Sequence, residues 1–255
     1  MSTPSASTVL KAFNVLSLFI ERQALGASEA AQLLNAPRAS THRMLVTLRT
    51  AGVLEVTESG QYQLSMRLFE LGCFAPLRRG LHEAAMRPIL RLTAFTQLPV
   101  QLAVRDGNEV LYLERVGYRE NNLTPVGQRG PLHASGVGKV LLAFTPQSFR
   151  AAYLASPLAP YTQYTCTSPE LLAQELERVR RRGVAYGRQE RHAGFFSVAR
   201  PVRDHQHQVV ASVSIVAEEP LKDRLSQFEI PLEKTCRDIE NQLLERWMSR
   251  EPAAV

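Results

Sequence analysis

Apolar residues recur every three or four positions in the N-terminal part of the chain. This spacing matches the turn of an α-helix and predicts three helices, over residues 8–20, 28–34 and 38–51. Ser28 is a residue type that caps the start of a helix, and Gly52 is one that ends a helix. We therefore expect a small helical unit at the start of the chain.

A β-hairpin is predicted directly after the third helix. Two short runs of strand-forming residues, Val53–Val56 and Gln61–Leu64, flank the turn sequence Glu58-Ser-Gly. Pro37 stands where the preceding turn meets the first helical position, which tolerates a missing N–H. A short helix, a turn, a polar helix and a hairpin in this order are typical of a winged helix-turn-helix, a fold that binds DNA.

The pattern changes from helical to strand-like near Pro99. Residues 66–96 have helical spacing with breaks near 73–76 and at Gly80, and this stretch contains the predicted linker. Beyond it we expect strands at 100–105, 109–116, 195–203 and 208–217, a loop at 118–130, and helices at 136–144, 169–182 and 221–248. Mixed hairpins and helices without regular alternation favour an α+β domain with a mainly antiparallel sheet.

Length and composition fit two globular domains. The chain has 255 residues, is 45% hydrophobic and 21% charged, and carries a formal net charge of +6. A basic balance permits nucleic-acid binding without requiring it. All but four of the 30 Lys and Arg residues are Arg, which suits bidentate contacts to phosphate or guanine, although a GC-rich genome produces the same bias.

Cysteine usage and hydropathy point to a cytoplasmic protein. Cys73, Cys166 and Cys236 are widely spaced, so neither a disulfide framework nor a zinc site is indicated, and no metal is expected. The N-terminus lacks the features of a signal peptide, and no uncharged apolar run is long enough to span a bilayer. We therefore expect reduced thiols and no membrane partner.

The third helix and the hairpin carry the candidate DNA contacts. In a helix-turn-helix the second helix enters the major groove, where Arg binds guanine and hydroxyl side chains contact bases or phosphates. The predicted DNA-binding residues are Ser28, Arg38, Ser40, Thr41, His42, Arg43, Thr47 and Arg49, with Gly60 and Gln61 at the hairpin tip. The alternative interpretation is the solvated face of an ordinary surface helix.

Residues 8–72 resemble the DNA-binding domain of the IclR family of bacterial transcription regulators. The segment Ala12-Phe-Asn-Val-Leu resembles the family's first helix, and Leu34-Asn-Ala-Pro-Arg-Ala-Ser-Thr-His-Arg-Met-Leu resembles its turn and recognition helix. The segment Gln61-Tyr-Gln-Leu-Ser-Met-Arg-Leu-Phe-Glu-Leu-Gly is similar to its wing and the start of its linker. Within these segments, the His-Arg pair followed by two apolar residues is fairly specific.

The C-terminal part carries two longer motifs. Gly130-Pro-Leu-His-Ala-Ser-Gly-Val-Gly-Lys-Val-Leu-Leu-Ala is similar to the effector-domain signature of the same family. Gly183-Val-Ala-Tyr-Gly-Arg-Gln-Glu-Arg-His-Ala-Gly-Phe-Phe-Ser-Val-Ala-Arg-Pro-Val is similar to its second signature. With the N-terminal match, the resemblance covers about residues 8–248 in the family's order.

The resemblance implies a domain layout and partners. It implies a winged helix-turn-helix DNA-binding domain over residues 1–65, a linker helix over 66–80, and a GAF-like effector-binding and oligomerisation domain over 81–255. It further implies a small-molecule effector, for which we expect a carboxylate or phenolic acid, and a homodimer or tetramer on a palindromic operator in double-stranded DNA.

The strand over residues 208–217 has two different faces. Val209, Ala211, Val213 and Ile215 form a wholly apolar face that is expected in the core. The opposite face has Ser212 and Ser214 between Val210 and Val216. This suits a ligand pocket, because small hydroxyls leave space and supply hydrogen bonds, but it also suits a solvated edge.

The positions of the family pattern imply the ligand contacts. The predicted ligand-binding residues are Gly136, Val137, Phe195, Ser197, Ser214 and Val216, with Glu190 at the rim. This chain has Ser197 where the family often has Cys, and Gly187 where it often has an acidic residue. The resemblance therefore implies a less acidic rim, with a hydroxyl in place of a thiol.

Other features of this half allow two interpretations. Ser135 begins a helix whose free N–H groups suit a carboxylate, and it equally suits a plain N-cap. Arg119 and Arg129, in the loop over 118–130, suit an anionic effector or a solvated surface.

Enzyme motifs are absent from the sequence. There is no nucleophile elbow, phosphate-binding loop or dinucleotide glycine motif, so neither catalysis nor a cofactor is expected. The sequence therefore predicts a transcription regulator whose operator binding is modulated by a small organic or aromatic acid. The alternative is a small-molecule-binding module whose helix-turn-helix mediates dimerisation.

Overall fold

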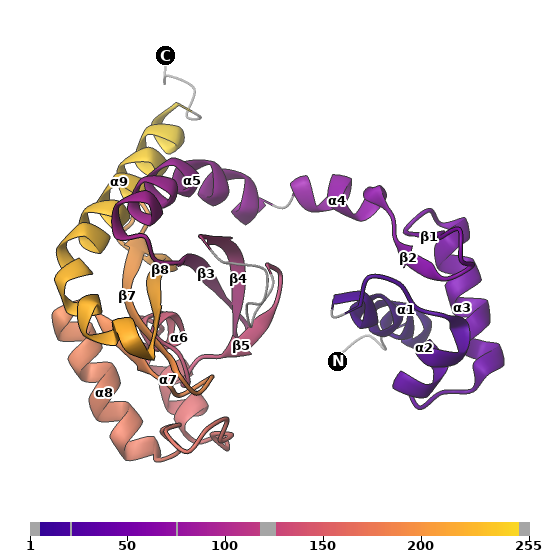
Figure 1. Ribbon diagram of the computed structural model, residues 1–255, viewed down its shortest axis with the longest axis horizontal. Helices are drawn as coiled ribbons and strands as arrows, with labels where there is room; N and C mark the ends of the chain where they lie inside the picture. The colour runs from indigo at the N-terminus through magenta and orange to yellow at the C-terminus, as the bar shows by residue number, and fades with distance from the viewer. Residues whose placement is uncertain (1–5, 21, 75, 118–125, 250–255) are drawn as a thin grey trace. The chain divides into compact units, whose positions relative to one another are not determined.

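The computed structural model describes residues 6–20, 22–74, 76–117 and 126–249. The chain divides into two compact units, Met1–Pro76 and Leu77–Val255, coloured indigo to purple and purple to yellow in Figure 1. The division falls inside the segment 66–80 that the sequence indicates as the linker.

The N-terminal unit is a winged helix-turn-helix. Its elements are the helix α1 (Ser7–Ser17), the 3-10 turn η1 (Leu18–Ile20), the helices α2 (Ala27–Leu33) and α3 (Arg38–Thr50), the strands β1 (Leu54–Val56) and β2 (Tyr62–Leu64), and the helix α4 (Met66–Cys73). The two strands pair antiparallel, with Leu54 opposite Leu64, and a bridge from Leu25 to Tyr62 ties the hairpin to the segment before α2. The predicted hairpin and its three preceding helices are confirmed.

The helices of this unit are held by one small core. Buried apolar side chains from α1, α3 and the hairpin meet there, among them Val15, Leu45 and Leu54. Gly52 follows α3 with φ +76°, a conformation that glycine adopts without strain, and the chain then turns into the hairpin. The predicted cap of α2 is wrong, because the helix begins at Ala27 and Ser28 lies inside its first turn.

The C-terminal unit is built on a six-stranded antiparallel sheet with the order β5-β4-β3-β8-β7-β6. Its strands are β3 (Val100–Asp106), β4 (Glu109–Val116), β5 (Arg129–Pro131), β6 (Ala185–Arg188), β7 (Phe195–Arg203) and β8 (Val209–Glu218). Its helices are α5 (Pro76–Thr96), α6 (Gly136–Ala143), α7 (Gln147–Leu154), α8 (Pro169–Arg182), the 3-10 segment η2 (Glu219–Phe228) and α9 (Glu229–Met248). The α+β class is confirmed.

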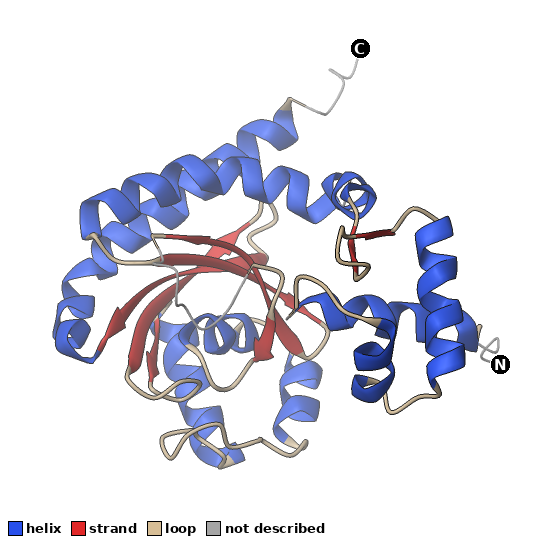
Figure 2. Ribbon diagram, turned by 45° about the vertical axis from the view of Figure 1, so that its right-hand side comes forward, coloured by secondary structure: helices blue, strands red, loops and turns tan. Residues whose placement is uncertain are grey.

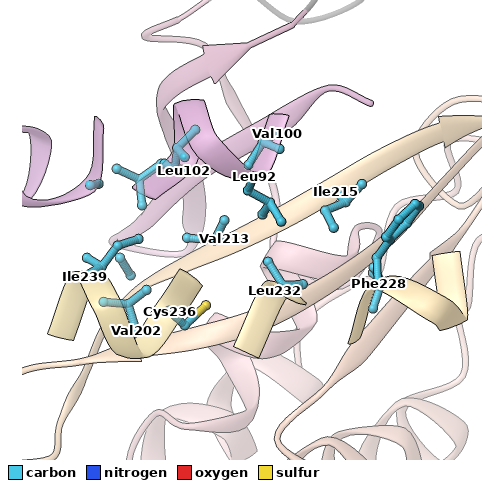
Figure 3. Close-up of a cluster of buried hydrophobic side chains, with 14 of the residues drawn as sticks. Leu92, Val100, Leu102, Val202, Val213, Ile215, Phe228, Leu232, Cys236 and Ile239 are labelled. Atoms are coloured by element: carbon cyan, nitrogen blue, oxygen red, sulfur yellow. The ribbon is translucent and has the colours of Figure 1, made fainter. Parts of the chain in front are cut away.

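Helices cover both faces of the sheet (Figure 2). Helices α5 and α9 lie on one face, where Leu92, Val213 and Leu232 belong to the same buried cluster (Figure 3). Helices α6, α7 and α8 lie on the other face, where α6 is buried along its whole length. Strand residues of β3 alternate between the two faces, so Leu102 packs toward α5 and Ala103 toward α6.

Two β-bulges alter this alternation. In β4, Glu114 pairs with Leu102 and Tyr112 pairs with Ala103, so Leu113 is the extra residue. As a result Tyr112 and Arg115 share the face that carries α6, and Glu114 faces α5.

The second bulge lies between β7 and β8, where Arg203 pairs with Val209 and Val202 pairs with Ala211. Val209 therefore packs on the α6 face, against the prediction, whereas Ala211, Val213 and Ile215 lie in the predicted core.

Several predicted boundaries change. Gly80 does not interrupt α5. The expected terminal helix is divided into η2 and α9, because Pro231 lacks the N–H that a continuing α-helix would need and is tolerated in the first turn of a new one. Part of the expected loop over 118–130 lies outside the described residues, and its end forms β5.

Within the described segments, no helix has the length and apolar character needed to cross a membrane.

Candidate DNA-reading helix and effector cavity

Helix α3 presents a row of polar side chains to solvent. The exposed members of the predicted set are Arg38, Ser40, His42, Arg43, Thr47 and Arg49. None of the ion pairs found among the described residues uses Arg38, Arg43 or Arg49. These guanidinium groups are therefore available for an external anion, and the helix has the character that a major-groove reader needs.

The expected exposure of Thr41 is wrong. Its side chain is buried, and its hydroxyl donates to the carbonyl oxygen of Pro37 at 3.2 Å. The helical period explains the error, because Thr41 lies four residues before Leu45 and hence on the same inward face. Ser40 and Thr47 are exposed, and each hydroxyl donates to a carbonyl of the preceding turn, which leaves the oxygen free to accept a hydrogen bond.

The other predicted contacts lie on α2 and on the hairpin. Ser28 is exposed in the first turn of α2. Gly60 is exposed at the hairpin tip with φ +80°. The backbone N–H of Gln61 donates to Oγ1 of Thr57 at 3.1 Å, which closes the turn.

A hollow of about 450 Å³ between α1 and α3 contains polar residues that the sequence reasoning missed. Lys11 and Asn14 of α1 line it together with Arg43 and Thr47 of α3. Lys11 is exposed and is one of only four lysines in an arginine-rich chain. Its position on the polar side of α1 was the sequence signal that could have indicated a residue of this hollow.

The C-terminal unit has a cavity of about 70 Å³ beside the start of α6. Its lining comes from β3, β4, β6, β7, β8, the residues before α6 and the β6–β7 connection. The lining residues are Gln101, Tyr112, Arg115, Ala134, Ser135, Gly187, Glu190, Arg191, His192, Phe195, Phe196, Ser197 and Val216. This volume is below the range of about 300–1,000 Å³ that is typical of small-molecule pockets, so a ligand of more than a few non-hydrogen atoms requires the lining to widen.

Four of the predicted ligand-binding residues line this cavity, namely Glu190, Phe195, Ser197 and Val216. Gly136 and Val137 do not line it, because both are buried within α6. Ser214 does not line it either, since its hydroxyl is buried and donates to Oε1 of Gln101 at 3.3 Å. Three of the predicted contacts therefore lie behind the cavity wall.

Close packing of Gly136, Gly187 and Ser197 shapes this wall. A Cβ atom added at Gly136 would lie 2.7 Å from Oγ of Ser197, and one added at Gly187 would lie 2.5 Å from the same oxygen. An acidic side chain at position 187 would therefore require Ser197 to move. The small residue at 187 lets the Ser197 hydroxyl lie between the two glycines.

A buried ion-pair cluster supports the rim. Nζ of Lys139 is fully buried in α6 and lies 2.6 Å from Oε1 of Glu190 and 2.7 Å from Oε1 of Glu175. The other carboxylate oxygen of Glu190 accepts the backbone N–H of Arg188 at 3.1 Å. The charged side chains of the lining are Arg115, Arg191 and Glu190, and the carboxylate of Glu190 is bound to Lys139.

Two titratable side chains of the lining are kept neutral. Burial raises the pKa of Tyr112, an effect that Ser135 and the nearby Arg115 and Arg191 partly offset. Burial lowers the pKa of His192, and the charges of Arg191 and Arg115 lower it further. The cavity therefore combines neutral hydrogen-bonding groups with two cations and two Phe rings.

The alternatives for Ser135 and Arg129 are resolved in part. Ser135 caps α6, since its Oγ accepts the N–H of Gly138 at 3.1 Å, and it also lines the cavity. Arg129 is paired with Asp106 and, at 3.2 Å, with Glu109, away from the cavity. Arg119 lies outside the described residues.

Residues of the cavity that the sequence reasoning missed are Gln101, Tyr112, Arg115, Ala134, Arg191, His192 and Phe196. Arg115 interrupts an otherwise strand-like run, which was a usable signal for a functional side chain. Its orientation was not predictable, because it depends on the bulge at Leu113. No group of His, Cys, Asp and Glu residues in the described parts of the chain has the arrangement of a metal site.

The fold and the two sites define a DNA-binding protein that contains a ligand-binding domain. Comparison with known families gives the particular class. Residues 8–58 match the IclR helix-turn-helix domain, and residues 76–241 match the family described as bacterial transcriptional regulator IclR C-terminal. The chain belongs to the IclR family of bacterial transcription regulators.

Curated relatives and solved structures agree with this assignment. The HTH-type transcriptional regulator KipR of Bacillus subtilis is 32% identical over 86% of this chain and 89% of its own length. The regulator BhcR of Paracoccus denitrificans is 33% identical over 80% of this chain and 75% of its own length. An IclR homologue from Microbacterium hydrocarbonoxydans, solved in complex with 4-hydroxybenzoate, is 30% identical with a TM-score of 0.85, over 92% of this chain and 98% of that one.

Proposed function

We propose that this regulator binds a small aromatic or organic acid in the cavity beside α6, and that the bound acid changes its affinity for an operator. The observation that carries the proposal is the composition of the cavity. Arg115 and Arg191 supply positive charge, while Phe195 and Phe196 supply apolar rings. A small anion with an aromatic or short aliphatic body matches this combination.

The polar groups of the lining support the same class of ligand. Ser135, Ser197 and the rim residue Glu190 offer hydrogen bonds to a hydroxyl substituent. The similar protein from Microbacterium hydrocarbonoxydans binds 4-hydroxybenzoate, a molecule with one carboxylate and one phenolic hydroxyl. Within the predicted ligand set, we assign direct contact to Glu190, Phe195, Ser197 and Val216, and a supporting role to Gly136, Val137 and Ser214.

On the DNA side, we assign sequence reading to the exposed face of α3. Arg38, Arg43 and Arg49 are exposed and outside the ion pairs of the described residues, so each is available to a guanine edge or a phosphate. Ser40, His42 and Thr47 add hydrogen-bonding groups along the same helix, and Gly60 and Gln61 place the wing next to the backbone.

The N-terminal unit also presents apolar side chains that suit contact with a second copy of the chain. On α1 they include Leu10 and Phe13, exposed by 55% and 64%, and after α4 Phe74 is exposed by 75%. Such exposure of large apolar groups is typical of an interface. We propose a homodimer or a tetramer, in which a pair of chains presents two α3 helices to a palindromic operator.

Regulation follows if the acid binds two arrangements of the paired DNA-binding units with different affinity. The segment 66–80 joins the two units of one chain, and we propose that it carries this change. The protein then acts by binding, without catalysis, in the cytoplasm where its operator lies.

A binding assay tests the proposal. Labelled DNA from the neighbourhood of the gene is titrated with the full chain at several salt concentrations, and a panel of small aromatic and aliphatic acids is screened by thermal shift. We expect tight, salt-sensitive DNA binding and a raised unfolding temperature with at least one acid. Acid binding without salt-sensitive DNA binding would instead support a ligand-binding module whose helix-turn-helix serves dimerisation.

A further inference from the structure

Nε2 of His192, a residue of the cavity lining, lacks the partner that buried polar atoms require. Nε2 of His192 is buried, and no hydrogen-bond partner for it exists among the described residues. Nearly all buried polar groups of folded proteins are hydrogen-bonded, because an unpaired one carries the full cost of its desolvation. His192 also belongs to the lining of the cavity, so a ligand that enters the cavity and widens it can supply the partner that Nε2 lacks.

The chain around His192 is held in position. The N–H of Gln189 donates to the carbonyl of Phe195 at 2.9 Å, and the N–H of Gly194 donates to Oε1 of Gln189 at 2.9 Å. The carbonyl of His192 accepts the N–H of Phe195 at 3.3 Å. These bonds close the β6–β7 connection on itself, so the unpaired nitrogen is part of a formed wall.

Among the described residues, the two charged groups that shift the pKa of His192 are both positive. Arg191 on the same connection and Arg115 on β4 are the charged groups that act on the imidazole, and both are part of the same lining. The one carboxylate of the lining, Glu190, is bound to Lys139 at 2.6 Å. Arg191 is itself held, because its guanidinium stacks 4.2 Å above the ring of Tyr161.

We propose that His192 is a specificity-determining residue of the effector site, which hydrogen-bonds the effector's carboxylate together with Arg115 and Arg191 and takes up a proton when the acid binds. The inference rests on the proposed function. An arriving carboxylate supplies the partner that Nε2 lacks and offsets the two positive charges. Both changes favour the imidazolium, which donates from Nε2 to a carboxylate oxygen.

The direction of the pH effect follows from these charges. In the free protein, burial and the two arginines lower the pKa of His192, so the imidazole is neutral at pH 7. The bound anion raises that pKa, and a ligand that raises a pKa binds more tightly as the pH falls. Acid binding is therefore stronger at pH 6 than at pH 8, and an uncharged analogue lacks this dependence.

Isothermal titration calorimetry of the full chain tests the proposal, with benzoate and 4-hydroxybenzoate as probes and benzamide as the uncharged analogue. Titrations at pH 6.5 in buffers of different ionisation enthalpy measure the protons taken up. We expect net uptake for the wild type, and about tenfold weaker acid binding for His192→Ala. His192→Gln, which keeps a hydrogen-bonding group but does not titrate, is expected to retain part of the affinity and to lose the proton uptake.

His205→Ala is the matched control, because His205 stacks on Trp247 at 4.4 Å and does not line the cavity. Thermal unfolding without ligand establishes whether each variant is folded. If His192→Ala is not folded, His192→Gln alone is used for the test. Acid binding with the same affinity and proton uptake in folded His192 variants would overturn this inference and leave the proposed function intact. Absence of acid binding by the wild type would overturn both.

Discussion

Nδ1 of His82 lies 2.5 Å from Oε1 of Glu114, and this contact joins helix α5 to strand β4. The neighbour of Glu114 on β4 is Arg115, which faces the cavity on the opposite side of the sheet. The pair therefore connects β4, which contributes Tyr112 and Arg115 to the cavity lining, to helix α5, which begins within the linker segment 66–80. The side chain of Glu114 is exposed by 15% and that of His82 by 39%, so the contact is buried on the side of β4 and reached by solvent on the side of α5.

Replacing His82 by Ala is expected to weaken the coupling between effector and DNA. Acid affinity should stay within about twofold of the wild type, because His82 does not line the cavity. The change that the acid causes in operator affinity should shrink, since the link from β4 to α5 is lost. Fluorescence anisotropy with and without the acid measures both quantities.

The control for this variant is Arg91→Ala. Arg91 lies on the same helix and forms an exposed pair with Asp238 at 3.5 Å, on α9 instead of β4. Equal losses of coupling in both variants, or an unchanged response in His82→Ala, would show that the contact between α5 and β4 has no special part in the signal.

Arg43→Ala is expected to weaken operator binding by about tenfold or more, as loss of a guanine contact does, without changing thermal stability. The prediction follows from the position of Arg43 on the exposed face of α3, outside the ion pairs of the described residues. Arg22→Ala is the control, because Arg22 is exposed in the same unit and pairs with Glu29 at 3.4 Å. Similar losses of operator affinity in both variants would indicate a general effect of positive charge, without a specific contact from Arg43.

Lys139→Met is expected to destabilise the C-terminal unit by about 3–5 kcal/mol, the typical result of removing one partner from a buried ion pair. The loss arises because Glu190 and Glu175 stay in place without their shared cation. Denaturant unfolding measures it. The double variant Lys139→Met with Glu190→Gln should recover part of the stability, whereas a further loss of stability would mean that Lys139 acts through something other than these carboxylates.

Glu240→Gln is expected to raise the unfolding temperature at pH 7. Burial raises the pKa of Glu240, an effect that Arg203 partly offsets. A carboxyl with a raised pKa in the folded state contributes stability at low pH that is lost as the pH rises through that pKa. The amide mimics the protonated form and keeps an acceptor for the N–H of Arg203, which lies 2.8 Å from Oε1 of Glu240.

Thermal scans from pH 4 to pH 8 should therefore show the largest difference between Glu240→Gln and the wild type at the alkaline end. Glu245→Gln, at an exposed position of the same helix, should show little difference across the range. A lower unfolding temperature for Glu240→Gln at pH 7 would contradict the assigned role of burial.

Local signals in the sequence predict much of this fold. The turn Asp106-Gly-Asn defines the β3–β4 hairpin, and Ser168, Pro169 and Gly183 define the ends of α8. In each case the residue type determines the backbone conformation within a few positions, so the local sequence is sufficient to predict where the element ends. The order of helices and hairpin in the N-terminal unit is predictable for the same reason.

The parts that could not be predicted depend on distant residues. Lys139 lies in an apolar helix, and its two carboxylate partners lie 36 and 51 positions away in the sequence. The bulge at Leu113 decides that Arg115 faces the cavity, and the pairing with β3 sets that bulge. The burial of Thr41 follows from the packing of α3 in the core, which polarity alone does not show.

The central claim is that acid binding in the C-terminal unit changes operator binding by the N-terminal unit. The most direct test is an anisotropy titration of labelled DNA from the gene's own neighbourhood, with and without a saturating concentration of the acid that binds most tightly in the thermal-shift panel. We expect salt-sensitive binding whose affinity changes by about fivefold or more when the acid is present. An operator affinity that is the same with and without a demonstrably bound acid would contradict it.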